Sequence, residues 1–177
     1  MNIELLKEKL PDYAKDIRLN LSNLFGNVSQ SGLTESQFYG TALAVAYSLR
    51  QADLLAAIKH EVSSSLFTEL DFAAKTAATI MAMNNVYYRF VHLAEDAEFT
   101  SMPANLRMNG LRSHGVDQMD FELFALAVSA INGCGLCISS HVQQLLQHGI
   151  STATMQTTIR LAATLNAVAQ ALFDSNQ

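Results

Sequence analysis

The sequence lacks any run of about 20 consecutive apolar residues, the length that a helix needs to cross a bilayer. Charged or polar side chains interrupt every hydrophobic stretch. Residues 1–9 carry charges of both signs, and they lack the uninterrupted apolar segment that defines a secretory signal. We therefore expect a soluble protein that is located in the cytoplasm.

Positive charge is scarce as well. The 11 Lys and Arg residues are outnumbered by 16 Asp and Glu, which gives a net charge of -5. Because a nucleic-acid-binding surface must neutralise phosphates, this balance argues against DNA or RNA as a partner. Charged residues make up only 15% of the chain, compared with roughly 25% in an average soluble protein. This composition favours a chain that buries part of its surface between subunits.

Cysteine occurs only twice, as Cys134 and Cys137. In a reducing cytoplasm such a pair is seldom a permanent structural crosslink. A catalytic dithiol and a metal site are the functional alternatives that remain.

No segment has the alternation of apolar and polar residues that is typical of a β-strand, so we expect an all-α fold. A chain of 177 residues can form one compact core, and we treat residues 1–177 as a single domain. Apolar spacing and helix stop signals predict helices at 11–26, 34–49, around 54–58, and at 68–87, 117–131, 134–148 and 151–173. Residues 99–116, which contain Pro103 and two glycines, are predicted to form a loop.

Four helix starts are predicted from residues that cap helices well. Thr34 begins a capping-box pattern, and Thr68 with Asp71 is predicted to begin a long helix. Asp117 and Ser151 are the expected caps of two later helices.

Two helical runs resemble each other weakly. Residues 71–72 and 120–121 are both Asp-Phe, and each pair opens a stretch of small residues. Each stretch leads to an asparagine-containing segment, at 83–85 and at 132–133, which we interpret as a helix break. The pattern indicates an internal duplication.

The two cysteines form a Cys-X-X-Cys pair at the expected start of a helix. Unpaired backbone N–H groups and the helix dipole favour a thiolate over a thiol at such a position. A thiolate is the form that attacks peroxides, and two cysteines three residues apart on a helix can close a disulfide locally. The pair is therefore the strongest candidate for a catalytic centre.

His141 lies four residues beyond Cys137 and seven beyond Cys134, so all three share one side of the predicted helix. An imidazole there can accept a proton from a thiol, directly or through one water. We expect Glu122, on the preceding helix, to pack beside His141 and hold it in position.

Two other interpretations of these residues remain open. The cysteines can be small core residues, or they can bind zinc together with His141 and either His114 or His148. A thioredoxin-like site is a poor match, because no strand precedes the pair and no proline follows it.

The chain resembles the alkylhydroperoxidase AhpD family, which belongs to a larger group that includes the carboxymuconolactone decarboxylases. The likeness rests on the Glu-x11-Cys-x2-Cys-x3-His pattern of Glu122, Cys134, Cys137 and His141. Residues 10–17, 83–89, 121–123 and 127–134 match the family as well, so the likeness covers nearly the whole chain.

This resemblance implies an all-α fold with a pseudo-repeat, usually assembled as a homotrimer. It also implies an antioxidant enzyme that reduces alkyl hydroperoxides and regenerates the oxidised peroxiredoxin AhpC. The electrons would come from dihydrolipoamide on a lipoyl-bearing component of a dehydrogenase complex, and no bound cofactor or metal is expected.

The resemblance also implies a role for each site residue. Cys137 would form the sulfenic acid and the interchain disulfide with AhpC. Cys134 would be the proton donor and resolving thiol of a Cys134–Cys137 redox disulfide, while His141 and Glu122 would form a proton relay. The residues alone leave the order of the cysteines open, because the helix dipole favours Cys134 and the spacing to His141 favours Cys137.

One position departs from the family pattern. A well-known member has a histidine just before its second cysteine, whereas this chain has Leu136. We expect the assisting role of that histidine to be lost, and peroxide reduction to be weaker than the activity that reduces the partner protein. A decarboxylase reaction on a lactone acid, as in the wider group, is a further alternative, although it does not call for a vicinal dithiol.

Overall fold

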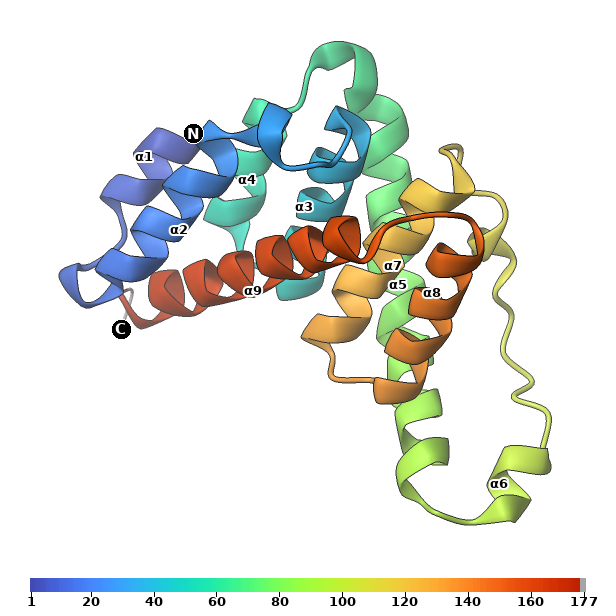
Figure 1. The fold of residues 1–177 in the computed structure, drawn as a ribbon. Helices are drawn as coiled ribbons and strands as arrows, with labels where there is room; N and C mark the ends of the chain where they lie inside the picture. Colours follow the sequence, from blue (N-terminus) through green and yellow to red (C-terminus); the bar gives the residue numbers. More distant parts are fainter. Residues whose placement is uncertain (176–177) are drawn as a thin grey trace.

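The computed structural model describes residues 1–175, which form an all-α fold without a strand in that range. The α-helices, labelled in Figure 1, are α1 (Ile3–Glu8), α2 (Lys15–Gly26), α3 (Glu35–Leu49), α4 (Ala52–Glu61), α5 (Ser64–Leu93), α6 (Ala97–Ser101), α7 (Gln118–Ile131), α8 (Gly135–Gln147) and α9 (Thr152–Asp174). Short 3-10 helices occur at η1 (Asp12–Ala14), η2 (Val28–Gln30) and η3 (Asn109–Leu111). The predicted fold class is confirmed.

Most of the predicted helix starts are also found. The Thr34 hydroxyl accepts a hydrogen bond from the Gln37 backbone N–H and completes a capping box at α3. Asp117 caps α7 and Ser151 caps α9 through their side-chain oxygens. The prediction for Thr68 is wrong, because α5 begins four residues earlier, at Ser64.

Helices α3 and α7 form the centre of the molecule, where α3 packs on α5, α7 and α9. Gly40 allows the closest approach: a Cβ built on it would lie 2.0 Å from the Phe124 ring. Phe124 and its neighbour Phe121 are fully buried. Helix α8 packs on α7 and on α5 beside this centre.

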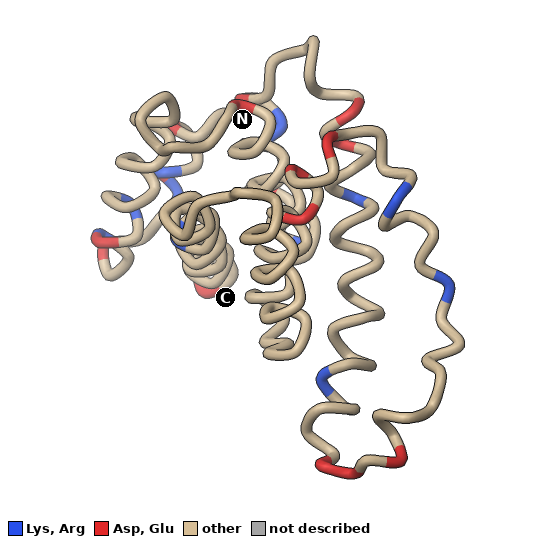
Figure 2. Tube along the Cα trace, turned by 45° about the vertical axis from the view of Figure 1, so that its right-hand side comes forward, with Lys and Arg blue, Asp and Glu red and all other residues tan. Residues whose placement is uncertain are grey.

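An arm extends away from this core. It consists of the second half of α5, α6 and the following loop, and it projects at the lower right of Figure 1. Phe90 and Phe99 make an edge-on ring contact within it at 5.0 Å between centroids, yet both remain exposed on the surface. Acidic residues occupy the tip of the arm in Figure 2. The arm therefore presents apolar side chains that this single chain does not cover.

The expected break at residues 83–85 is not present, because α5 continues unbroken through this segment. The buried Asn85 donates a hydrogen bond to Ser129 Oγ at 2.9 Å and accepts one from the Asn132 amide at 2.9 Å. These contacts tie α5 to the end of α7, so an asparagine in the middle of a helix serves as a tertiary contact. The second expected break, at residues 132–133, does separate α7 from α8.

No helix among residues 1–175 combines the length and the apolar character that spanning a bilayer requires.

Candidate active site

The turn between α7 and α8 fixes the two cysteines at a helix start. Gly133 adopts a φ of +67°, a conformation that glycine reaches without steric cost. The Cys134 backbone N–H then bonds to the Ser129 carbonyl at 3.1 Å. Cys134 is the N-cap of α8, and its sulfur accepts the backbone N–H of Cys137 at 3.3 Å. The two sulfurs are joined in a disulfide.

The two sulfurs differ in their access to solvent. Cys134 is completely buried, whereas Cys137 is 8% exposed and lines a cavity of about 470 Å³. A small molecule that enters this cavity can therefore contact the Cys137 side chain, while Cys134 lies behind it. This asymmetry could not be derived from the spacing of the two cysteines in the sequence.

His141 and Glu122 make the contact that the sequence predicted. His141 Nδ1 lies 2.6 Å from Glu122 Oε2, and both side chains are largely buried. An ionised carboxylate can only accept, so Nδ1 carries the proton in this hydrogen bond. The other ring nitrogen, Nε2, is then left unprotonated in the neutral imidazole and is available to a proton donor. His141 lines the same cavity as Cys137.

Gln118 and His114 form a chain of hydrogen bonds that leads to Glu122, and the sequence did not predict this chain. Gln118 Nε2 donates to Glu122 Oε1 at 3.1 Å. The amide oxygen of Gln118 therefore faces His114 Nε2 at 3.0 Å and must accept from it. His114 is 4% exposed and stacks on the Phe121 ring at 4.1 Å, so its imidazole is firmly held.

The sequence contained one signal for this chain of hydrogen bonds. Gln118 precedes Glu122 by four residues, a spacing that places both side chains on one side of a helix. His114 also precedes Gln118 by four residues, but it lies in the loop before α7, where this spacing does not predict a contact.

The environment of Glu122 keeps its carboxyl group ionised. Burial raises the pKa of Glu122, but the hydrogen bond and charge of His141 and the Gln118 hydrogen bond outweigh this effect. The net result is a pKa below the ordinary value of 4.5. Glu122 can therefore orient His141 and stabilise its protonated form without itself taking the proton.

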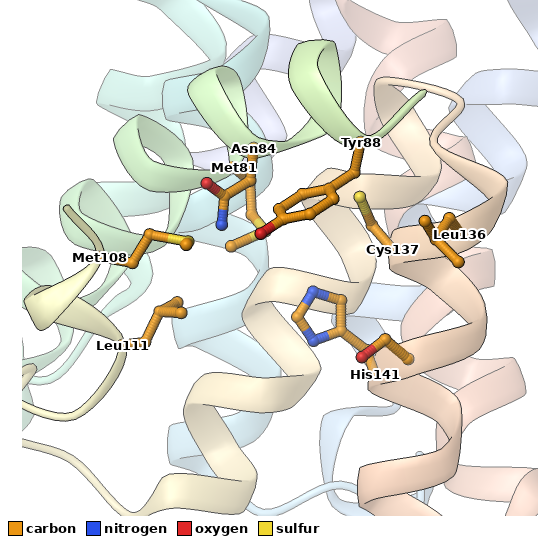
Figure 3. Close-up of a pocket in the computed structure, with 9 residues that line it drawn as sticks. Met81, Asn84, Tyr88, Met108, Leu111, Leu136, Cys137 and His141 are labelled. Carbon is orange, nitrogen blue, oxygen red and sulfur yellow. The ribbon is translucent and has the colours of Figure 1, made fainter. Parts of the chain in front are cut away.

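The cavity beside Cys137 is mainly apolar (Figure 3). Its residues come from α5, from the loop around η3 and from the first half of α8, and they are Met81, Asn84, Tyr88, Met108, Leu111, Leu136, Cys137, Ser140 and His141. Leu136, the position that departs from the family pattern, contributes an apolar side chain to this wall. The cavity can accommodate an alkyl or acyl chain next to the Cys137 sulfur.

The side chains proposed for a zinc site do not form a metal-binding group, since the two cysteines are joined in a disulfide. His148 lies beyond the far end of α8 and bonds to the Gln144 carbonyl at 2.8 Å. Over residues 1–175, no group of three or more His, Cys, Asp or Glu side chains is close enough to hold a metal ion.

Comparison with known proteins gives the family. The model of the Carboxymuconolactone decarboxylase family matches residues 97–174. An alkyl hydroperoxide reductase AhpD of Rhodopseudomonas palustris (strain BisA53) is 54% identical over 169 residues, which cover 96% of this chain and 92% of that protein. The chain belongs to the AhpD family.

Two further relatives from the AhpD family extend the match. The alkyl hydroperoxide reductase AhpD of Maricaulis maris (strain MCS10) is 52% identical over 97% of this chain and 98% of its own length. That of Coxiella burnetii (strain RSA 493 / Nine Mile phase I) is 48% identical over 99% of both chains. The resemblance inferred from the sequence is thus confirmed over almost the full length.

Proposed function

We propose that this AhpD-family chain is a thiol peroxidase that reduces alkyl hydroperoxides, with Cys137 as the attacking residue. The observation that carries the proposal is the position of Cys137 in the wall of an apolar cavity, together with His141, whose Nδ1 is held by Glu122. The AhpD names of the relatives support the same activity.

The oxidative half of the cycle begins at Cys137. Its thiol loses a proton to His141 Nε2, and the thiolate attacks the terminal oxygen of the hydroperoxide. The S–O bond forms as the O–O bond breaks, and the departing alkoxide takes a proton and leaves as an alcohol. Cys134 then attacks the Cys137 sulfenic acid through its sulfur and gives up its proton, so that water is released and the disulfide forms.

The reductive half begins with attack on the more accessible sulfur. A thiolate of dihydrolipoamide attacks Cys137 and releases Cys134 as a thiol, which leaves a mixed disulfide. The second donor thiol then displaces Cys137 and closes the cyclic disulfide of lipoamide. Two electrons and two protons pass to the protein, and no bound cofactor is needed.

The reduced dithiol can also serve a protein substrate. We propose that it regenerates oxidised AhpC through a disulfide between Cys137 and the peroxiredoxin, and that a lipoyl-bearing dehydrogenase component supplies the electrons. The position of Cys137 in the cavity wall, where it is 8% exposed while Cys134 is completely buried, supports this assignment. A cycle that depends on such donors belongs in the reducing cytoplasm.

We also propose that the chain functions as a homotrimer and that the arm takes part in subunit contacts. Large apolar side chains are more than half exposed on the second half of α5, namely Val86, Phe90 and Leu93. Apolar surface of this kind is commonly covered by another protein chain. The low charged fraction of the sequence supports the same assembly.

A turnover assay tests the proposed function. Purified protein is supplied with cumene hydroperoxide and dihydrolipoamide, with and without AhpC, and hydroperoxide consumption is measured. We expect turnover that Cys137→Ser abolishes and that His141→Phe lowers about 100-fold, because general base catalysis contributes on this scale. Ser139→Ala, an exposed change on α8, is the matched control. Full activity of Cys137→Ser would exclude the proposed nucleophile.

A further inference from the structure

Tyr88 brings a phenol group to the cavity that Cys137 and His141 line. The side chain is half-buried, and within residues 1–175 its hydroxyl makes no hydrogen bond to another residue. Its oxygen is not one of the fully buried, unpaired polar atoms of that range, so it keeps accessible surface. A molecule in the cavity can therefore accept a hydrogen bond from Tyr88.

The hydroxyl of Tyr88 faces away from the reacting sulfur. The ring makes an edge-on contact with the Tyr87 ring at 5.2 Å between centroids, and both residues belong to α5. In Figure 3 the Tyr88 ring extends across the cavity, and its hydroxyl is at the end that points away from Cys137. The hydroxyl is thus directed at atoms of a bound molecule that lie beyond the atom in contact with the sulfur.

Reduction of a hydroperoxide requires a proton at such a position. The sulfur, the attacked oxygen and the leaving oxygen lie roughly in line during the displacement, so the leaving oxygen is the one farther from Cys137. It departs as an alkoxide, a strong base, unless a proton donor meets it there. In the proposed cycle His141 acts on the thiol, which leaves the far oxygen without an assigned donor.

We propose that Tyr88 is this donor, and that it gives its proton to the leaving oxygen of the hydroperoxide as the O–O bond breaks. This inference rests on the proposed function. The Cys137 thiolate supplies the electron pair of the new S–O bond, the O–O pair leaves with the alkoxide, and the phenol proton completes the alcohol. Tyr88 then regains a proton from the His141 imidazolium through solvent, so in sum the thiol proton ends on the alcohol.

The acidity of the two groups makes this transfer favourable, because a phenol is a stronger acid than an aliphatic alcohol. The same comparison gives the test, which uses two oxidants whose leaving groups differ in their need for a proton. Cumene hydroperoxide releases a tertiary alkoxide, whereas peroxybenzoic acid releases benzoate, an anion that is stable without a proton. Both oxidants carry a phenyl ring that suits an apolar cavity.

The reaction is followed in a single turnover, so that the reductive half of the cycle does not contribute. The fully reduced protein is mixed with each oxidant, and the rate at which its thiols are consumed is measured. Tyr88→Phe removes only the hydroxyl and keeps the ring that contacts Tyr87. Tyr13→Phe, at a tyrosine that is 70% exposed and outside the cavity wall, is the matched control.

We expect Tyr88→Phe to lower the rate with cumene hydroperoxide by at least about tenfold, since general acid catalysis has an effect of at least this size. Its rate with peroxybenzoic acid should stay close to that of the wild-type protein. Tyr13→Phe should leave both rates unchanged. His141→Phe should lower both rates, because it acts on the thiol and not on the leaving group.

Each contrary outcome bears on a different claim. Unchanged rates in Tyr88→Phe would overturn the role of Tyr88 and leave Cys137 as the nucleophile. An equal loss with both oxidants would overturn that role as well, because it would show that the hydroxyl supports the fold or the thiol rather than the leaving group. If the reduced wild-type protein reacted with neither oxidant, the proposed function would be overturned, and this inference with it.

Discussion

At the scale of single residues, only one assignment of donors and acceptors satisfies the hydrogen bonds that lead to Glu122. His114 donates to the Gln118 oxygen, the Gln118 amide donates to Glu122, and His141 donates to the other carboxylate oxygen. Both oxygens of Glu122 are thereby engaged, and His141 keeps Nε2 free. The position of the imidazole in the cavity that Cys137 lines thus depends on the hydrogen bonds of Glu122, Gln118 and His114.

Gln118→Leu tests this dependence. Loss of the amide leaves Glu122 Oε1 without its donor, so we expect kcat for peroxide reduction to fall about fivefold, with little change in KM, because the contact is partly exposed to solvent. Because the Gln118 hydrogen bond is one of the interactions that lower the pKa of Glu122, the acid limb of the pH profile of kcat should move to higher pH in the same variant. Gln143→Leu, on the exposed side of α8, is the control. An unchanged pH profile together with an unchanged kcat would contradict the positioning role.

The contributions of two acidic residues of α7 to the stability of the fold should change in opposite directions as the pH falls. Interactions with His141 and Gln118 outweigh burial and lower the pKa of Glu122, so its contribution to stability is present above its ordinary value of 4.5 and is lost as the pH falls. Burial raises the pKa of Asp120 above 3.8, with a smaller effect of Asp117, so its protonation on acidification favours the folded state.

The measurement is the free energy of unfolding in urea, at several pH values between about 3 and 7. The stability advantage of the wild-type protein over Glu122→Gln should shrink as the pH falls below 4.5. For Asp120→Asn, the free energy of unfolding of the wild-type protein relative to the variant should increase as the pH falls through the acidic range. If the difference in free energy of unfolding between the wild-type protein and the variant changed with pH in the same direction for both variants, the opposite pKa shifts of Glu122 and Asp120 would be contradicted.

Much of the candidate site at this scale was predicted from the sequence. The spacing of Cys134, Cys137 and His141 singled out these three residues, and Glu122 was expected to pack beside His141, a contact that is present. Which cysteine is accessible depends on how α8 packs against α5, a long-range feature that local spacing does not contain.

At the scale of secondary structure, local signals predicted helix starts well and helix continuity less well. The capping patterns at Thr34, Asp117 and Ser151 are found as expected. The start at Thr68 was wrong because α5 extends back to Ser64, where the side chain of the N-cap residue Ser63 makes no capping hydrogen bond to the helix backbone. The segment containing Asn85 stays helical because tertiary hydrogen bonds outweigh its weak helix propensity.

Gly40→Ala tests the close packing of α3 against α7. A new Cβ would overlap the buried Phe124 ring, so we expect the free energy of unfolding to fall by about 1–3 kcal/mol although alanine is the better helix former. Gly26→Ala is the matched control, since a Cβ there meets no atom within 4 Å and should not destabilise the protein. Equal effects of the two substitutions would show that the contact with Phe124 is unimportant.

At the scale of the whole molecule, the arm should decide the assembly state. Phe90 is 53% exposed on α5 and Leu19 is 58% exposed on α2, so they form a matched pair of surface apolar residues. We expect sedimentation of the wild-type protein to give about three times the 19.3 kDa chain mass. Phe90→Glu should lower the measured mass toward that of a single chain, and Leu19→Glu should leave it unchanged. A wild-type monomer would contradict the proposed trimer.

The most direct test of the central claim is to identify the sulfur that peroxide oxidises. The reduced Cys134→Ser protein is treated with one equivalent of cumene hydroperoxide, the sulfenic acid is trapped with dimedone, and the adduct is located by peptide mass spectrometry. Our account predicts an adduct on Cys137, and little on Cys134 in the reciprocal Cys137→Ser protein. An adduct on Cys134 alone, or none on either cysteine, would contradict it.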